Sequence, residues 1–143
     1  MESGTWTWFD HTADVGLEVS APSLEALFST SAMALFDLLI ETGATTEDQT
    51  PNEHAITLHA ANPPELLVRW LSELLYLHET ADLVFRRLQV THLSDDHLIG
   101  VVIWEPFDRA RHRIKREIKG VTYHQVSVVE EPAGWRARVI LDV

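Results

Sequence analysis

The chain has 143 residues, a length that suits one domain with a single core. Its 22 acidic and 11 basic residues give a formal net charge of −11, which argues against a protein that coats nucleic acid over most of its surface. It contains no cysteine, so disulfide bonds, iron–sulfur clusters and thiolate metal sites are excluded.

The charge is distributed unevenly along the chain. Residues 1–82 contain 14 acids and a single cation, Arg69, and so carry −13, whereas residues 83–143 contain eight acids and ten cations and carry +2. The first residues lack the basic and apolar regions of a signal peptide, and the longest apolar stretch, residues 32–40, is too short to span a bilayer. We therefore expect a cytoplasmic protein that does not associate with membranes.

The N-terminal part is predicted to form two short strands followed by a helix. The strands cover residues 5–9 and 15–20 and flank a polar turn. Apolar residues then recur at helical spacing over residues 23–41, with Ser23 as the N-cap and Gly43 as the stop signal.

A third strand and a second helix follow. Residues 55–60 alternate as a strand does, and Asn62 can cap a helix that has Pro63 at its first position and Glu65 two residues later. In this helix Trp70 and Tyr76 lie at the spacing of an apolar stripe, so we expect both in the core and not as platforms for stacking bases.

The remaining chain is predicted to form two hairpins, with strands at residues 83–93, 98–104, 121–130 and 135–143. Residues 42–53 and 105–118 are predicted loops. Hairpins dominate this order of elements, which indicates an α+β fold: a single two-layer domain over residues 1–143, with two helices packed on one face of a largely antiparallel (mixed) β-sheet.

The densest polar cluster lies between the first two strands, at residues 10–16. Asp10 and Asp14 are four residues apart in a tight turn and can converge on one hard cation, because Ca²⁺ and Mg²⁺ prefer several oxygen ligands. Asp, Thr and Gly are also ordinary turn residues, with Gly16 supplying a positive φ. From this segment alone, a purely structural turn is the stronger interpretation.

The C-terminus offers further oxygen ligands. An apolar strand ends in Asp142 and Val143, so a side-chain carboxylate lies beside the terminal carboxylate. If this strand pairs near the first turn, Asp14, Asp142 and the Val143 carboxylate or carbonyl would form an oxygen site completed by water. Such ligands suit Ca²⁺, Mg²⁺ or Mn²⁺ better than Zn²⁺. The alternative is a polar cap at the end of a strand.

Sequence blocks in order along nearly the whole chain resemble the archease family. They are DHTADVG and SLEALF, then LLVRWLSELLYL, EIKGVTYH and LDV, at residues 10–16, 23–28, 66–77, 117–124 and 141–143. The resemblance implies a small α+β protein that is not itself an enzyme. Its partner would be an RtcB-type RNA ligase, which joins RNA 2′,3′-cyclic phosphate or 3′-phosphate ends to 5′-hydroxyl ends in tRNA splicing and RNA repair.

The resemblance also implies a mechanism and a metal site. Archeases promote guanylylation of the ligase's active-site histidine, support multiple turnover and broaden nucleotide use, so RNA and GTP would reach this chain mainly through the ligase. The family's metal site falls on Asp14, Asp142 and the backbone of Val143. At position 10 other archeases can have Glu, which also carries a carboxylate, so Asp10 is a candidate to support the ligands and not a required direct ligand. His11 would either orient a ligand or be a turn histidine, and the turn role is favoured because imidazole is a poor ligand for hard cations.

A basic run at residues 109–119 contains six of the eleven cations. It could contact RNA phosphate or the ligase's nucleotide, although a charge run is usually a solvated face. Lys119 is the leading candidate for a partner or phosphate contact, with Arg113 and Arg116 next. Trp104 precedes Glu105 where many archeases have Gly, which leaves the role of Glu105 open.

Two other functions remain as alternatives. One is a metal-dependent hydrolase or nuclease that activates water at the acidic corner, and the other is an RNA-binding, chaperone-like adaptor that uses residues 109–119. The sequence contains no Gly-rich phosphate loop, His-Glu-x-x-His helix or Ser-His-Asp order, so an accessory protein is favoured over an enzyme. His54 and His59 are five residues apart on a strand and point to opposite faces, so they cannot form a metal pair.

Overall fold

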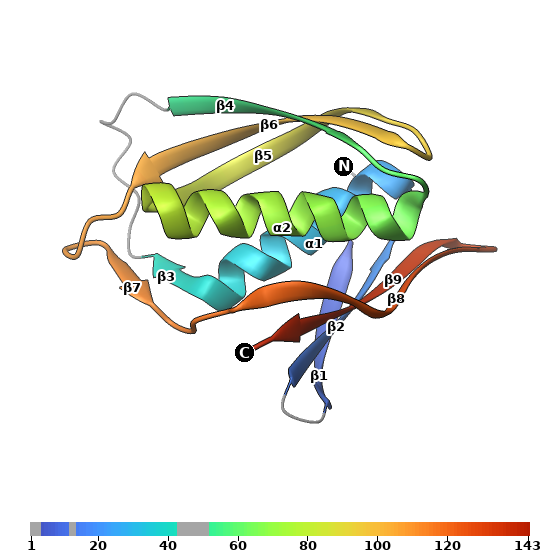
Figure 1. Cartoon of the computed structure of the whole chain (residues 1–143), viewed down its shortest axis with the longest axis horizontal. Helices are drawn as coiled ribbons and strands as arrows, with labels where there is room; N and C mark the ends of the chain where they lie inside the picture. Colours follow the sequence, from blue (N-terminus) through green and yellow to red (C-terminus); the bar gives the residue numbers. More distant parts are fainter. Residues whose placement is uncertain (1–3, 12–13, 43–51) are drawn as a thin grey trace.

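The computed structural model describes residues 4–11, 14–42 and 52–143. In chain order its elements are β1 Thr5–His11, β2 Asp14–Ala21, α1 Leu24–Leu39, β3 Ile40–Thr42, β4 Asn52–His59, α2 Pro63–Ala81, β5 Leu83–Leu93, β6 His97–Pro106, β7 His112–Ile114, β8 Gly120–Glu131 and β9 Gly134–Asp142 (Figure 1). None of the helices in this described part is long and apolar enough to cross a membrane.

The strands of the described residues form three antiparallel sheets. Their orders are β1-β2-β9-β8, β4-β6-β5 and β3-β7. The two helices lie between the two larger sheets (Figure 1), where α1 contacts β2 and β5, and α2 contacts β8, β4 and β5. The predicted α+β class is therefore confirmed.

Division into separate sheets follows from the burial of α1. Its buried residues, which include Leu27, Phe28, Ala32, Ala34 and Leu35, occupy most of its circumference. A helix that is apolar on most sides must be covered on more than one side. One sheet covers the helix pair from each direction, so the predicted strands do not join into a single sheet.

The predicted helix starts are confirmed by their caps. Ser23 Oγ accepts a hydrogen bond from the Ala26 N–H at 3.1 Å, and Asn62 Oδ1 accepts one from the Glu65 N–H at 3.0 Å. Glu65 Oε2 also accepts from the Ala61 N–H at 3.1 Å. The start of α2 is therefore stabilised by two reciprocal hydrogen bonds between side chain and main chain, as in a capping box.

The first helix ends earlier than predicted. Its last residue is Leu39, because Ile40 is already extended and begins β3 while its N–H still bonds to the Phe36 carbonyl. The predicted stop, Gly43, lies outside the described residues. The strand β7 falls within the predicted loop 105–118. A strand of three residues is too short to show an alternation of apolar and polar residues in the sequence. The strands β3 and β7 form because they pair with each other.

One tryptophan joins the two helices in the core. Trp70 is fully buried, and its Nε1–H donates to the Phe28 carbonyl at 3.0 Å, so its polar atom is satisfied. This confirms its predicted core position. The prediction was wrong for Tyr76, which is 60% exposed.

Glycine at position 16 makes room for an aromatic side chain on the outer face of the four-stranded sheet. Gly16 lies within β2 and pairs with Phe9 on one side and Ile140 on the other. A Cβ at position 16 would overlap the Phe9 ring. The Arg138 guanidinium lies 4.2 Å from the centre of that ring, and it also pairs with Glu18 at 3.3 Å. The glycine is needed for space, and not for the positive φ expected from the sequence.

Substituting Gly16 with alanine should therefore destabilise the fold. We expect Gly16→Ala to lower the free energy of unfolding by about 1–3 kcal/mol, because the added methyl displaces Phe9. The matched control is Gly120→Ala in β8, where an added Cβ has no neighbour within 4 Å and the change should stay within about 0.5 kcal/mol. Urea unfolding measures both. Equal effects of the two variants would show that the Phe9 contact is unimportant.

Candidate functional site

The end of the β1-β2-β9-β8 sheet brings residues from distant parts of the chain into one row. His11 pairs with Asp14, Asp14 with Asp142, and Asp142 with Gly120. The predicted acidic corner depended on the last strand pairing beside the N-terminal turn, and β9 does pair with β2 there. Asp14 and Asp142, from opposite ends of the sequence, are therefore direct neighbours across two strands.

The two aspartates share one face of the sheet. Directly opposite residues of antiparallel strands project to the same side, with Cβ atoms about 5 Å apart. Asp14 is half-buried and Asp142 is exposed. Like charges opposite each other destabilise a sheet, so this corner concentrates negative charge that a bound cation would offset.

Main-chain groups complete the surroundings of Asp142. Val143 follows it directly and packs in part against the core, which holds its backbone beside Asp142. The Lys119 N–H donates to the Asp142 carbonyl at 2.8 Å, and the Lys119 side chain is exposed. The leading candidate for a partner contact is therefore anchored next to the acidic pair.

The register separates Asp10 from this row. Asp10 is exposed and pairs with Val15, one position along from the pairing of His11 with Asp14. Successive residues of a strand project to opposite faces, so the convergence of Asp10 and Asp14 expected from their spacing does not occur in this register. The main chain of His11 lies in the Asp14 row, while its side chain lies outside the described part of the structure.

The donors at the corner are all oxygen atoms. Within residues 4–11, 14–42 and 52–143, no group of three or more His, Asp or Glu residues is arranged to hold a metal ion. An ion at the corner would therefore need main-chain oxygen and water in addition to the two carboxylates, and Val143 is the residue that directly follows Asp142. Such a donor set fits Ca²⁺, Mg²⁺ or Mn²⁺.

A buried cluster in the basic run gives Glu105 a structural role. Glu105 is 3% exposed. Its carboxylate accepts from Arg111 Nη2 at 2.7 Å and from His112 Nε2 at 3.0 Å. His112 is also buried, and its Nδ1 accepts from the Asp108 N–H at 2.8 Å, so the ring proton lies on Nε2 and points to Glu105. These bonds fix the turn that leads into β7.

The ionic state of Glu105 depends on these partners. Burial raises the pKa of its carboxyl, but hydrogen bonds from Arg111 and His112 and the charge of Arg111 outweigh burial, and the pKa ends below its ordinary value. The same contact raises the pKa of Arg111. No sequence pattern indicated this cluster, since Arg111 and His112 are six and seven residues from Glu105 in a segment predicted to be a loop.

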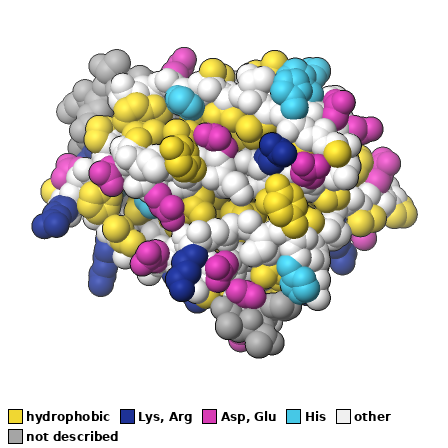
Figure 2. Space-filling view, in the orientation of Figure 1, with side chains coloured by type: hydrophobic (Ala, Val, Ile, Leu, Met, Phe, Trp, Pro, Cys, Tyr) yellow, Lys and Arg dark blue, Asp and Glu magenta, His cyan; other side chains and the backbone are white. Residues whose placement is uncertain are grey.

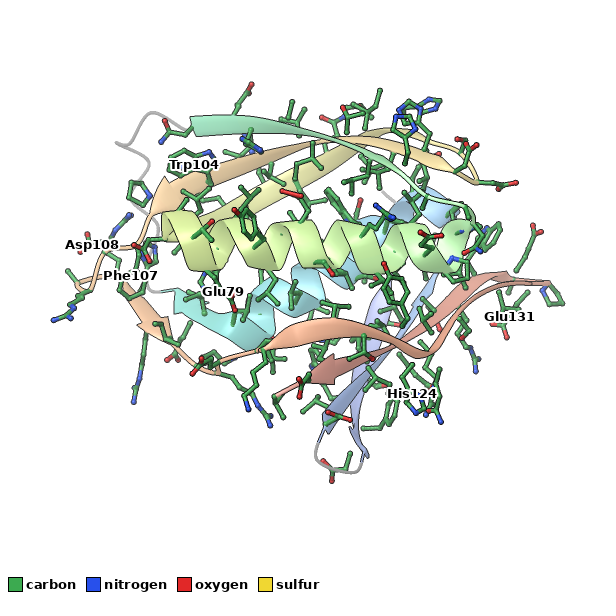
Figure 3. The ribbon with its side chains drawn as sticks, viewed as in Figure 1. Glu79, Trp104, Phe107, Asp108, His124 and Glu131 are labelled. Atoms are coloured by element: carbon green, nitrogen blue, oxygen red, sulfur yellow. The ribbon has the colours of Figure 1, made fainter. Side chains whose placement is uncertain are left out.

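The cations of the basic run therefore fall into two groups: some make bonds within the protein, and others are exposed to solvent. Arg111 stabilises the buried cluster, and Lys115 Nζ donates to the Asp37 carbonyl at 2.8 Å. Arg113, Arg116 and Lys119 are exposed. Arg116 lines a groove of about 510 Å³ with apolar residues that include Leu39, Phe107, Ile114 and Ile118. Figure 3 shows Phe107 and Asp108 at the end of the molecule where Glu79 of α2 lies.

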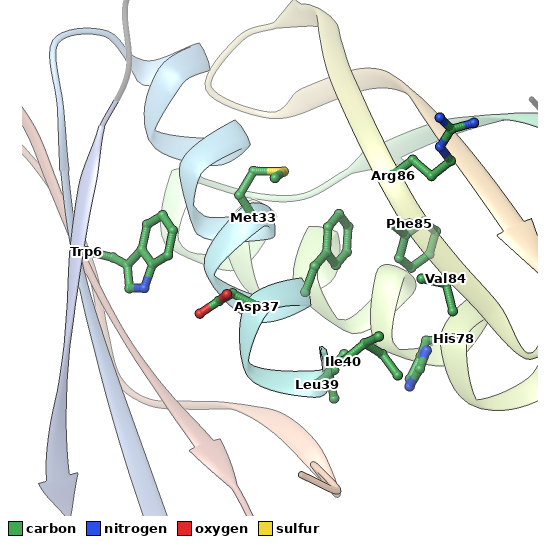
Figure 4. A pocket seen from close by; sticks show the side chains of 10 residues that line it. Trp6, Met33, Asp37, Leu39, Ile40, His78, Val84, Phe85 and Arg86 are labelled. Carbon is green, nitrogen blue, oxygen red and sulfur yellow. The ribbon is translucent and has the colours of Figure 1, made fainter. Parts of the chain in front are cut away.

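A separate pocket lies between β1, α1 and β5. It has a volume of about 210 Å³ (Figure 4), and its mainly apolar lining includes Trp6, Met33, Phe36 and Phe85. Phe36 and Phe85 stack with ring centroids 4.5 Å apart. None of the residues that line this pocket was predicted as a site residue.

The structure thus defines a small α+β protein with a pair of acidic residues at the end of one sheet. The model of the archease protein family (MTH1598/TM1083) matches residues 6–143. The chain belongs to the archease family.

Individual relatives cover nearly the whole chain. Protein archease of Methanosarcina barkeri is 33% identical over 142 residues, which are 96% of this chain and 95% of that protein. Protein archease of Pyrococcus furiosus is 33% identical over 142 residues, covering 96% and 98%. These two relatives therefore match this chain over nearly the full length of both proteins.

Solved structures agree on the fold. The solution structure of Methanobacterium thermoautotrophicum protein 1598 superposes with a TM-score of 0.72 at 31% identity, covering 96% of this chain and 98% of that one. The crystal structure of a Thermotoga maritima archease, described as a possible chaperone, has a TM-score of 0.63 at 17% identity and covers 94% of each chain. At that identity the second structure supports the fold alone.

The buried cluster predicts a specific dependence of stability on pH. A lowered folded-state pKa means that ionised Glu105 contributes stability above about pH 4.5, and that this contribution is lost as the pH falls through the folded-state pKa. We expect Glu105→Gln to reduce the free energy of unfolding by about 2 kcal/mol at pH 7, because a buried charge-assisted hydrogen bond is lost. The difference from wild type should shrink in acid.

Urea unfolding at pH 7 and below pH 4 measures this difference. The matched control is Glu117→Gln, at an exposed position in the same segment, which should change little at either pH. A deficit in Glu105→Gln that is constant across this pH range would contradict the assigned ionic role.

Proposed function

We propose that this chain is an accessory protein of an RtcB-type RNA ligase in tRNA splicing or RNA repair, and that it promotes guanylylation of the ligase's active-site histidine. It would support multiple turnover and broaden nucleotide use without catalysing a reaction itself. The observation that carries the proposal is the pairing of Asp14 with Asp142 in a chain of the archease family.

Charge supports a basic enzyme as the partner. The chain carries −11 overall, and Figure 2 shows acidic side chains spread over the visible face with few cations among them. Complementary potentials speed the encounter of two proteins. The exposed cations Arg113, Arg116 and Lys119 would then contact phosphate groups carried by the partner, while the acidic surface meets the ligase.

The acidic corner would hold a divalent cation in this function. Asp14, Asp142 and the main-chain oxygen of Val143 would bind it; the pairing of Asp14 with Asp142 supports this assignment, and Asp10 and His11 lie on the neighbouring strand. A bound divalent cation would neutralise phosphate oxygens of the nucleotide. The protein's own residues would fix the position of the corner and present Lys119 beside it.

Cation binding can be tested without the ligase. We expect Ca²⁺ to raise the unfolding temperature of the wild type, with a gain of about 2.7 kcal/mol at 100 times the dissociation constant. Asp14→Asn and Asp142→Asn should abolish the gain. In metal-free buffer Asp142→Asn should be at least as stable as wild type, because one of two like charges that face each other is removed.

Thermal unfolding monitored by circular dichroism measures this effect. The matched control is Asp95→Asn in the β5–β6 turn, which is also exposed and should keep the full response. An equal Ca²⁺ response in wild type and Asp142→Asn would refute the metal site at this corner.

The ligase function predicts a loss of multiple turnover. With ligase limiting, wild-type chain should yield many joined RNA products per ligase molecule, whereas Asp14→Asn or Asp142→Asn should yield about one. Asp95→Asn again serves as the control. Product counting on RNA with 2′,3′-cyclic phosphate and 5′-hydroxyl ends measures this effect.

Two results would favour the alternatives. Chelator-sensitive RNA cleavage by the isolated chain would support a hydrolase instead. If the triple variant Arg113→Ala, Arg116→Ala and Lys119→Ala loses RNA binding while the ligase keeps its turnover, the RNA-binding adaptor would be supported instead.

A further inference from the structure

Three histidines from three adjacent strands meet at one end of the β4-β6-β5 sheet. His59 is the last residue of β4 and pairs directly with His97, the first residue of β6. Their rings stack with centroids 4.3 Å apart and an angle of 6° between planes. The ring of His92 on β5 lies 5.1 Å from that of His97. Figure 2 shows histidine side chains gathered at this end of the molecule.

The register places all three on the solvent face of the sheet. His92 pairs with Ile99, which is two residues from His97 and so projects to the same side. The intervening Leu98 points inward and is fully buried. His59 and His92 are exposed, and His97 is half-buried.

Backbone contacts hold the three strands in this arrangement. The Ala60 N–H donates to the Asp96 carbonyl at 2.9 Å, which ties the end of β4 to the β5–β6 turn. Within that turn the Ser94 N–H donates to the His97 carbonyl at 2.9 Å, and Ser94 Oγ donates to Asp96 Oδ1 at 3.2 Å. The Cα positions of the histidines are thus fixed before any ligand binds.

We propose that His59, His92 and His97 form a binding site for a divalent transition-metal ion such as Zn²⁺. Imidazole is a preferred ligand of Zn²⁺, Cu²⁺ and Ni²⁺, whereas hard cations select oxygen. The site lies on a different sheet from the Asp14–Asp142 corner and selects a different class of metal. Its existence does not depend on the function proposed above.

Binding requires the exposed rings to turn. In this structure His59 and His97 stack instead of converging, and the described residues contain no preformed group of three metal-binding side chains. Rotation about the side-chain torsions of His59 and His92 moves their ring nitrogens without disturbing the strands, because both side chains are in solvent. Water would complete a tetrahedral set of ligands.

A Zn²⁺ titration of the full, tag-free chain tests the site. We expect one Zn²⁺ per chain by calorimetry, together with shifts in the imidazole nitrogen resonances of His59, His92 and His97. His92→Ala and His97→Ala should each weaken binding by at least the roughly 10- to 100-fold that loss of a supporting residue costs at a metal site. His59→Ala should weaken binding in the same way, and since His59 and His92 are both exposed, these two substitutions should leave the fold intact.

Two controls separate this site from other metal binding. His54→Ala, also on β4 and exposed, should retain wild-type affinity because the odd spacing places His54 on the opposite face from His59. The double variant Asp14→Asn with Asp142→Asn should also retain it.

Several results would overturn the proposal. They are unchanged imidazole resonances in millimolar Zn²⁺, an equal loss of affinity in His54→Ala and His92→Ala, loss of binding in the double aspartate variant, or a ratio of one Zn²⁺ to two chains.

Discussion

The placement of β9 between β2 and β8 is the constraint on which the acidic corner depends. Alternation along β9 buries Ala137, Val139 and Leu141 under the helices, and this burial selects the register, because a shift by one residue would turn these side chains to solvent. The same register sets Asp142 opposite Asp14. Hydrophobic burial on the inner face therefore keeps two acidic residues opposite each other on the outer face.

The core leaves the outer faces of both larger sheets available for binding. The helices lie between these sheets and occupy their inner faces, so polar residues of the strands project outward in rows. One outer row brings together carboxylates and another brings together imidazoles. Because the two rows lie on separate sheets, the chain presents an oxygen-rich corner and a nitrogen-rich corner that suit different classes of cation.

The buried Glu105 cluster changes the meaning of the basic segment. A sequence count suggests a dense positive patch, but Arg111 is neutralised by Glu105, and the Lys115 ammonium is bound to a helix carbonyl. The exposed remainder is smaller, and it includes Arg116 at the groove and Lys119 beside the acidic corner. Such a surface is better matched to a few phosphate contacts than to a long nucleic acid.

The sequence by itself determined the helices, the long strands and the α+β class, because caps such as Ser23 and Asn62 and the alternation along β9 are local signals that the core reinforces. It also indicated Asp14 and Asp142 as candidates. Only the tertiary structure decided that these two residues are paired, that Asp10 lies in another row, and that Glu105 and three histidines form clusters. These outcomes depend on strand register and on contacts between segments far apart in the chain, and no local pattern encodes them.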